Sequence, residues 1–258
     1  MSHPPPPGAD ARAWAALCGP PLAHRGLWSA DAPENSLAAF EAAAAAGYGM
    51  ELDVQLSADE QVVVFHDDRL ERLTEGLGRT ADQPAAALAA LRIVGSGQTI
   101  PRLDQVLTSV AGRGLVLVEL KVLAGDEGRL EPRVAEILDA YDGPVAILSF
   151  NPRVLAWFAA HRPRTLRGLN SCAYHDAADW MIPAGERQAL AELDHIELAQ
   201  PHFLSLGLDM LPSASADALR RHALPVICWT VRTQAQWARL AGHCDNLIFE
   251  GFRPEVSP

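Results

Sequence analysis

The sequence has little of what marks secreted, membrane-bound or nucleic-acid-binding proteins. Its 258 residues include only four cysteines, Cys18, Cys172, Cys228 and Cys244, and none forms a C-x-x-C pair. This spacing argues against a disulfide framework or a zinc site and indicates reduced, mostly buried thiols. No apolar run approaches the ~18 residues of a membrane-spanning helix. We therefore expect a cytoplasmic protein without stable membrane insertion.

Positive charge is also scarce. The chain has 21 Lys and Arg against 32 Asp and Glu, which gives a formal net charge of −11. A nucleic-acid-binding surface would need a basic patch to displace counterions, so we expect no nucleic-acid partner. A single small anion in a locally positive pocket remains compatible with this balance. The sequence leaves the oligomeric state open.

The first residues lack the basic and then apolar order of a signal peptide. Four consecutive prolines at 4–7 favour an extended chain, and we expect residues 1–12 to form a disordered, Pro-rich leader. Residues 13–258 are then expected to form one domain. The chain is 49% hydrophobic, which is enough for one sizeable core, and its length is common for an α/β barrel.

Apolar runs and helical patterns alternate along the chain. The expected parallel strands are Leu22–Arg25, Tyr48–Leu56, Leu115–Lys121, Val145–Phe150, Thr165–Leu169, Phe203–Leu206, Pro225–Val231 and Asn246–Glu250. The expected helices are Ala13–Leu17, Ser36–Ala46, Leu103–Val110, Arg129–Asp139, Pro152–His161, Gly185–Leu193, Ser215–His222 and Gln234–Leu240. Eight strands that alternate with helices predict an α/β fold, the TIM (β/α)8 barrel.

One gap in this alternation is too short for a parallel crossover. The strand expected at Val62–Phe65 follows Tyr48–Leu56 after only Ser57–Gln61, whereas a crossover needs roughly a dozen residues. The two strands must therefore form an antiparallel hairpin, which brings His66 beside Glu51. The Gly- and Pro-containing residues that follow indicate a small insertion after this hairpin, over about 57–101.

Carboxylates interrupt the apolar strands. Glu51 and Asp53 are two residues apart and point to one face of a strand, and Glu119 lies near the end of another. Two such acids inside a barrel would repel each other unless a cation lay between them. All-oxygen ligands favour a divalent metal, Mg²⁺ or Ca²⁺, over zinc. The alternative is an exposed sheet edge or an ion-pair network.

Histidine and cationic side chains follow the same strands. His24 and His66 can act as acid and base near neutral pH, although a histidine that ends an apolar run is often only structural. Asp67 either orients His66 or belongs to a turn. Arg25 offers a planar fork and Lys121 a point charge for phosphate oxygens. Both cations could also neutralise the carboxylates, and the two roles are compatible.

These residues lie in motifs that resemble the glycerophosphodiester phosphodiesterase family. The motifs are H-R-G at 24–26, P-E-N-S at 33–36, E-L-D-V at 51–54, D-E-Q-V-V-V-F-H-D at 59–67, L-x-R-L-T-x-G-x-G at 70–78, V-E-L-K at 118–121, S-F-N-P at 149–152 and W-T-V at 229–231. Two positions depart from the family pattern. Arg102 stands where a threonine is usual, and Phe249-Glu250 replaces the usual Thr-Asp.

The resemblance implies a barrel with an insertion and metal-dependent hydrolysis of glycerophosphodiesters to glycerol 3-phosphate and an alcohol. The implied site comprises the metal ligands Glu51, Asp53 and Glu119, the acid–base pair His24 and His66, and the phosphate-binding residues Arg25 and Lys121. Glu34, in the P-E-N motif, is a possible metal or substrate contact. Trp229 is either an apolar wall beside the glycerol or head group, or a core residue.

The mechanism expected from this set has His24 as base and His66 as acid. The base activates water or the substrate's own glycerol hydroxyl, while the metal and Arg25 stabilise the charge on the phosphate oxygens. One alternative is a phospholipase D-type lyase that acts on lysophospholipids or sphingolipids and leaves a cyclic phosphate. Another is a non-catalytic barrel that binds phosphorylated ligands. The partner expected in the first case is a small-molecule glycerophosphodiester substrate.

Overall fold

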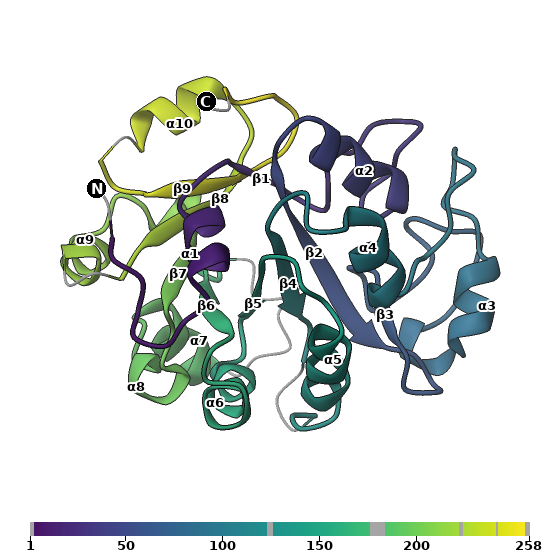
Figure 1. Ribbon diagram of the computed structural model, residues 1–258, viewed down its shortest axis with the longest axis horizontal. Helices are drawn as coiled ribbons and strands as arrows, with labels where there is room; N and C mark the ends of the chain where they lie inside the picture. Colours follow the sequence, from purple (N-terminus) through teal and green to yellow (C-terminus); the bar gives the residue numbers. More distant parts are fainter. Residues whose placement is uncertain (1–2, 123–125, 176–183, 222–223, 241, 256–258) are drawn as a thin grey trace.

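The computed structural model describes residues 3–122, 126–175, 184–221, 224–240 and 242–255. Within these ranges, eight parallel strands close into a barrel, because β1 pairs with both β2 and β9 (Figure 1). The eight strands are β1 (Leu22–Ala23), β2 (Gly49–Leu56), β4 (Val116–Leu120), β5 (Val145–Ser149), β6 (Leu166–Ser171), β7 (Phe203–Gly207), β8 (Val226–Val231) and β9 (Asn246–Phe249). A ninth strand, β3 (Val62–Val64), pairs antiparallel with β2 at the edge of the sheet. The expected TIM barrel is confirmed.

Most of the helices connect these strands and cover the outside of the barrel, while the first helix closes one end of it and the third lies in the insertion. They are α1 (Ala11–Leu17), α2 (Leu37–Ala45), α3 (Ala85–Ala90), α4 (Leu103–Val110), α5 (Leu130–Asp139), α6 (Pro152–His161), α7 (Ala184–Ala191), α8 (Ile196–Ala199), α9 (Ala214–Arg221) and α10 (Gln234–Arg239), with 3-10 turns η1 (Thr80–Asp82) and η2 (Leu208–Met210). Helix α4 illustrates the packing. Leu103, Val106, Leu107 and Val110 follow the helical period and are all buried. None of the helices in the described ranges is long and apolar enough to cross a membrane.

The predicted hairpin is confirmed. Strand β3 runs antiparallel to β2, with Val64 opposite Val54. Residues after β3 form an insertion that holds η1 and α3, at the side of the barrel beside β2 and α4 (Figure 1). The insertion has its own small core, which includes Phe65, Leu70 and Leu88. The chain therefore leaves the barrel after β3 and returns to it at α4.

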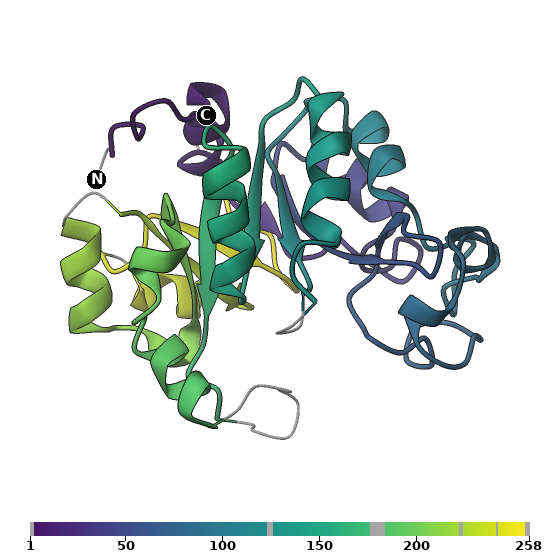
Figure 2. The same ribbon diagram turned by 90° about the horizontal axis from the view of Figure 1, so that it is seen from below.

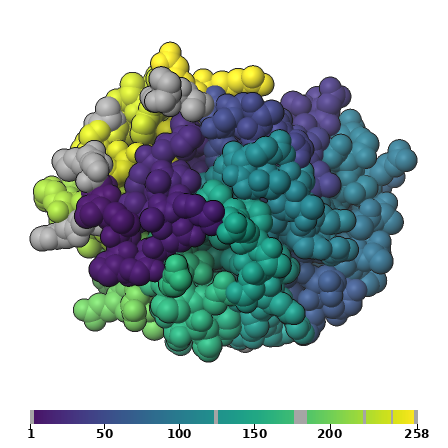
Figure 3. Space-filling view, viewed as in Figure 1, coloured from purple at the N-terminus to yellow at the C-terminus, as the bar shows by residue number. Residues whose placement is uncertain are grey.

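Helix α1 closes the amino-terminal end of the barrel. Trp14 and Leu17 pack with inward-facing strand residues such as Leu117 and Phe203. Figure 2 shows the N-terminal segment on the opposite side of the barrel from α7, and Figure 3 shows it lying across the outer surface. The barrel interior is thus filled at the amino-terminal ends of the strands, and open space is left at their carboxyl ends.

The N-terminal boundary differs from the expected one by two residues. Helix α1 begins at Ala11, because the Asp10 carboxylate caps it by accepting from the backbone N–H groups of Arg12 and Ala13. Residues 11 and 12 therefore belong to this helix and not to the leader. The backbone carbonyl of His3 accepts from Trp14 Nε1 at 2.9 Å. The division of the chain into a leader and one domain otherwise stays a prediction.

Most strand ends differ from the expected ones by at most one residue. Two differ by two residues, and both differences shape the site. Strand β1 ends at Ala23 instead of Arg25, because Arg25 turns into the left-handed region with φ 57°. Strand β6 runs on to Ser171, two residues beyond the predicted end, and so contains Asn170. The four cysteines are free thiols, of which Cys18 is exposed and the other three are buried.

Candidate active site

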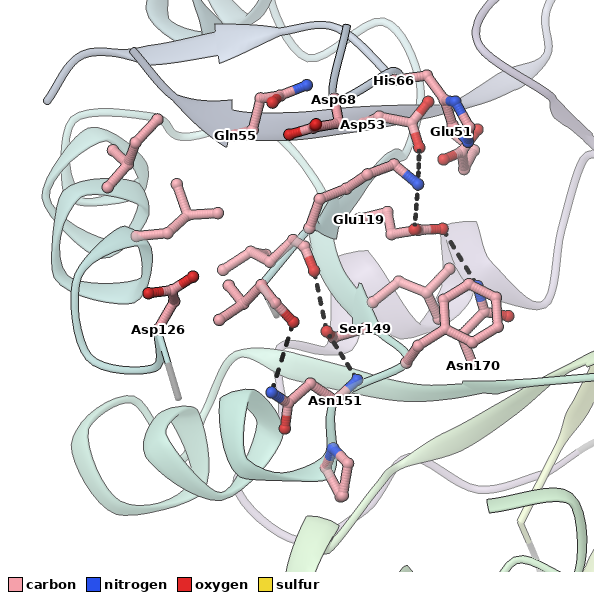
Figure 4. Close-up of a pocket in the computed structure, with 18 of the residues that line it drawn as sticks. Glu51, Asp53, Gln55, His66, Asp68, Glu119, Asp126, Ser149, Asn151 and Asn170 are labelled. Carbon is pink, nitrogen blue, oxygen red and sulfur yellow. Dashed lines mark hydrogen bonds and ion pairs between the residues drawn. The ribbon is translucent and has the colours of Figure 1, made fainter. Parts of the chain in front are cut away.

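A cavity of about 690 Å³ opens at the carboxyl ends of the barrel strands. All seven residues predicted as ligands, acid–base pair or phosphate binders line it: His24, Arg25, Glu51, Asp53, His66, Glu119 and Lys121. Figure 4 shows Glu51, Asp53 and His66 at one end of this cavity and Asp126 at the other. The side chains named from the sequence are thus brought together in space.

Three buried carboxylates form the floor of the cavity. Glu51 and Asp53 are two residues apart on β2 and so lie on the same face of the strand. In the neighbouring strand β4, Glu119 lies opposite Asp53. One oxygen from each of the three acids lies within 4.8 Å of the others. Burial, and next the negative charges of Asp53 and Glu119, raise the pKa of Glu51 well above its ordinary value. Hard oxygen donors concentrated at a buried site fit a divalent cation such as Mg²⁺ or Ca²⁺.

Lys121 and Arg25 supply positive charge to these acids. Lys121 Nζ lies 3.1 Å from an oxygen of Asp53 and 2.9 Å from one of Glu119, and Arg25 Nε lies 3.3 Å from Asp53. Burial alone would raise the pKa of Asp53, but the charge of Lys121 and other nearby cations outweighs it and holds the pKa below its ordinary range. Both cations therefore neutralise the acids while they line the cavity.

The turn after β1 explains the H-R-G motif. The left-handed backbone of Arg25 directs its N–H to Glu51 Oε2 at 3.0 Å. Gly26 follows with φ 84°, and a Cβ there would lie 2.8 Å from the Ala39 backbone. Only glycine fits this close approach at positive φ. The motif thus fixes the loop that carries His24 and Arg25 against helix α2.

His24 is held by a carboxylate from the last strand. Its Nδ1 lies 2.7 Å from Glu250 Oε2, and its Nε2 lies 4.0 Å from Glu51. The hydrogen bond from His24 outweighs partial burial and lowers the pKa of Glu250 to about 2. Glu250 is therefore ionised at neutral pH and can only accept, so Nδ1 carries the proton and Nε2 is left for the cavity.

His66 has a similar arrangement. Its Nδ1 lies 2.7 Å from Asp67 Oδ1. Partial burial would raise the pKa of Asp67, but hydrogen bonds from His66 and Arg72 outweigh it and keep the pKa below its ordinary value. The side chain of Gln55 donates to the carbonyls of Phe65 and Asp67, which fixes the segment around His66. Of the two interpretations of Asp67, the geometry matches the orienting one.

Glu34 and Trp229 differ from each other in their position relative to the cavity. Glu34 is not among the residues that line the cavity in the described part of the chain, and it accepts from Arg25 Nη1 at 2.6 Å. Trp229 does line the cavity, where its ring packs edge-on against Phe150 with centroids 5.7 Å apart. Among the described residues, its buried Nε1 has no hydrogen-bond partner, which leaves one donor for a bound molecule.

Several residues that support the site were not predicted from the sequence. The Asn35 amide donates to Asp53 Oδ2 at 2.9 Å, and the Asn170 amide donates to Glu119 Oε2 at 3.1 Å. Asn35 lies in the quoted P-E-N motif, and Asn170 is a polar residue directly after the strand expected at Thr165–Leu169. Those were the available signals. Glu250 was noted only as a departure from the family pattern, and nothing local pointed to its contact with His24.

The amino-acid sequence is similar to those of known phosphodiesterases. The model of the glycerophosphoryl diester phosphodiesterase family matches residues 24–245. YhdW of Bacillus subtilis is 29% identical over 229 residues, which cover 85% of this chain and 88% of that protein. A glycerophosphodiester phosphodiesterase of Caldanaerobacter subterraneus is 34% identical over 142 residues, 50% of this chain and 57% of that protein.

Solved structures show the same similarity. A phosphodiesterase of Oleispira antarctica, in complex with the product sn-glycerol-3-phosphate, matches with a TM-score of 0.78 and 26% identity, over 92% of this chain and 94% of that one. The glycerophosphodiester phosphodiesterase of Thermotoga maritima matches with a TM-score of 0.68 and 25% identity, over 88% and 92%. From its fold, its site and these matches, the chain belongs to the glycerophosphoryl diester phosphodiesterase family of enzymes.

Proposed function

We propose that the chain hydrolyses glycerophosphodiesters to glycerol 3-phosphate and an alcohol, with His24 and His66 as the acid–base pair. One observation carries this proposal. Each ring gives its Nδ1 to a carboxylate while both rings line the cavity that holds the buried acids. Such pairing fixes the tautomer and leaves Nε2 to exchange a proton with a substrate. The solved relative from Oleispira antarctica, which holds sn-glycerol-3-phosphate, supports the substrate class.

The acids Glu51, Asp53 and Glu119 would hold the divalent cation. When bound, Mg²⁺ or Ca²⁺ supplies positive charge to a phosphate oxygen and lowers the pKa of a bound water. Arg25 and Lys121 add positive charge beside these acids, where it can stabilise the charge that develops on the phosphate. The aromatic pair Phe150 and Trp229 offers an apolar wall for the glycerol or the head group.

In the proposed reaction, His24 Nε2 accepts a proton from the nucleophile as the new P–O bond forms. His66 gives a proton to the alcohol oxygen as the old P–O bond breaks. If water is the nucleophile, glycerol 3-phosphate forms directly. If the substrate's own glycerol hydroxyl attacks, a cyclic phosphate forms first and water opens it in a second step.

The test is release of glycerol 3-phosphate from glycerophosphoethanolamine. His24→Asn and His66→Asn should each lower kcat by about 10²–10⁴-fold, the usual contribution of general acid–base catalysis. His161→Asn is the matched control, because His161 is exposed on α6 and stacks on Trp157 away from the cavity. If both site variants kept more than about a tenth of the wild-type kcat, the acid–base assignment would be wrong.

Metal removal tests the second part of the proposal. Dialysis against EDTA should abolish turnover, and separate additions of Mg²⁺ and Ca²⁺ should show which ion restores it. An unchanged rate after EDTA would remove the cation from the mechanism. Phosphorus NMR of the same reaction distinguishes the alternatives. An accumulating cyclic phosphate from a lysophospholipid would identify a lyase, and binding of the diester without any turnover would identify a non-catalytic barrel.

A further inference from the structure

We propose that Arg72, in the insertion, is a positioning residue that holds His66 and Arg25 in place through two carboxylates. The inference rests on the proposed function, which gives His66 and Arg25 their roles. Arg72 lies in the L-x-R-L-T motif and is not among the residues that line the cavity in the described part of the chain. It therefore acts on the reaction only through its neighbours.

The guanidinium of Arg72 binds two carboxylates at once. Its Nε and Nη2 donate to the two oxygens of Asp67 at 2.5 and 2.9 Å. Its Nη1 and Nη2 donate to the two oxygens of Glu34 at 3.0 and 2.8 Å. The planar fork of arginine allows both bidentate pairs, whereas the single ammonium of lysine could not reproduce them.

The oxygens that Arg72 binds are those that hold the site. Asp67 Oδ1 accepts from Arg72 Nη2 and also lies 2.7 Å from His66 Nδ1. Glu34 Oε1 accepts from Arg72 Nη2 and also from Arg25 Nη1 at 2.6 Å. A single nitrogen of Arg72 thus bridges the carboxylate oxygen that orients the histidine and the one that orients the arginine.

Charge supports the same role. Without Arg72, two carboxylates that share its guanidinium would repel each other. Glu34 and Asp67 are mostly buried, with side chains 16% and 20% exposed, so water can replace the lost partner only in part. Asp67 and Glu34 would then be free to turn. The His66 ring, which Asp67 holds, and the Arg25 guanidinium, which Glu34 holds, would turn with them.

The insertion is built to present this arginine. Leu70 is buried in the insertion core, and the Thr74 hydroxyl donates to its carbonyl at 2.9 Å, which closes the turn that carries Arg72. Arg69, in the same segment, makes a different contact. It is 62% exposed, is paired only with Glu71 among the ion pairs of the described residues, and does not line the cavity. Arg69 is therefore a matched control.

The experiment compares two substrates that differ in their need for an acid. Glycerophosphoethanolamine releases an alkoxide that must be protonated, while a glycerophospho-p-nitrophenyl ester releases a stable phenolate. Arg72→Gln should lower kcat for the first substrate about 10- to 100-fold and for the second by clearly less. His66→Asn should show the same dependence on the leaving group. Arg69→Gln should behave like the wild type, and the melting temperature of Arg72→Gln should stay within a few degrees of it.

A purely structural role would give a different pattern. An Arg72→Gln variant that loses the same factor on both substrates, while His66→Asn discriminates between them, would overturn the proposal, as would a variant within twofold of the wild type. If His66→Asn itself fails to discriminate, the acid role of His66 in the proposed function is wrong. In that case the double variant Arg72→Gln/Asp67→Asn tests the positioning role. Losses in kcat that add up refute this role, and losses that do not add up support it. If Arg72→Gln does not fold, Arg72→Lys takes its place, and failure of both to fold would make Arg72 a structural residue only.

Discussion

Glu250 offers the most direct test of how His24 is held. Replacing it with glutamine should lower kcat while KM changes little, because the amide can donate to Nδ1 and so favour the tautomer with a protonated Nε2. That tautomer cannot accept a proton from the nucleophile. Glu250→Asp keeps the charge one methylene shorter and should recover part of the activity.

The structure sets the size of the effect. The pKa of Glu250 falls from 4.5 to about 2, and the hydrogen bond from His24, 2.7 Å long, is the largest contribution that lowers it. This fall corresponds to about 3 kcal/mol of net stabilisation of the ionised Glu250 carboxylate. It is a net value, since Arg232 also lowers the pKa of Glu250 through a contact of 2.6 Å, while partial burial raises it. In Glu250→Gln, the imidazolium that forms when His24 accepts a proton would lack this stabilisation. Loss of all of it would slow the reaction about 10²-fold.

The same interaction predicts a dependence of stability on pH. Because the folded state lowers the pKa of Glu250, the stabilisation is present above about pH 4.5 and is lost as the pH falls towards 2. The free energy of unfolding of Glu250→Gln should therefore lie below that of the wild type at pH 7, and the two should converge in acid. Urea unfolding at several pH values and steady-state kinetics measure both effects. A glutamine variant with kcat within threefold of the wild type would refute the reasoning.

Three further predictions concern the support of the site and the core. Asn35→Ala removes the amide that donates to Asp53 at 2.9 Å, so calorimetric titration should show Mg²⁺ or Ca²⁺ bound about 10- to 100-fold more weakly; an unchanged Kd would contradict this. Gly26→Ala should lose about 1–3 kcal/mol in urea unfolding and more than Gly47→Ala, because both have positive φ but only the Cβ at 26 meets the Ala39 backbone; equal losses would contradict the close approach. Phe158 is fully buried on α6, so Phe158→Ala should lower the free energy of unfolding by about 3–5 kcal/mol. A loss below 1 kcal/mol would contradict this, because it would mean that the neighbouring side chains fill the space that the ring leaves.

The sequence was sufficient for the barrel because strand spacing constrains topology. The gap Ser57–Gln61 excludes a parallel crossover, and the hairpin that it predicts is the one observed between β2 and β3. Helices α4 and α6 match their predicted bounds. Both begin beside a clear signal, a proline two residues before the first buried leucine for α4 and a proline at the first position for α6. Strand ends were less predictable, since the left-handed turn at Arg25 goes with the close packing of Gly26 against helix α2, a contact that the apolar pattern of the strand does not show.

The cavity residues could be predicted for a related reason. Parallel strands meet at their carboxyl ends, so ionisable residues near those ends must share a space. The side chains that orient them were harder to find. Glu250 and His24 are 226 positions apart, and Arg72 reaches Glu34 from 38 positions away. Such contacts depend on how the barrel closes and how the insertion folds back, which no local pattern encodes.

Helix α1 closes one end of the barrel, so in the described part of the chain the cavity is open at the other end. Trp14 and Leu17 fill the closed end, so a diester substrate and its two products would share the opening at the carboxyl ends of the strands. Under the proposed function, glycerol 3-phosphate retained near Lys121 would obstruct the next diester and inhibit competitively. The rate at which this anion departs then sets a ceiling on turnover that faster bond cleavage cannot raise.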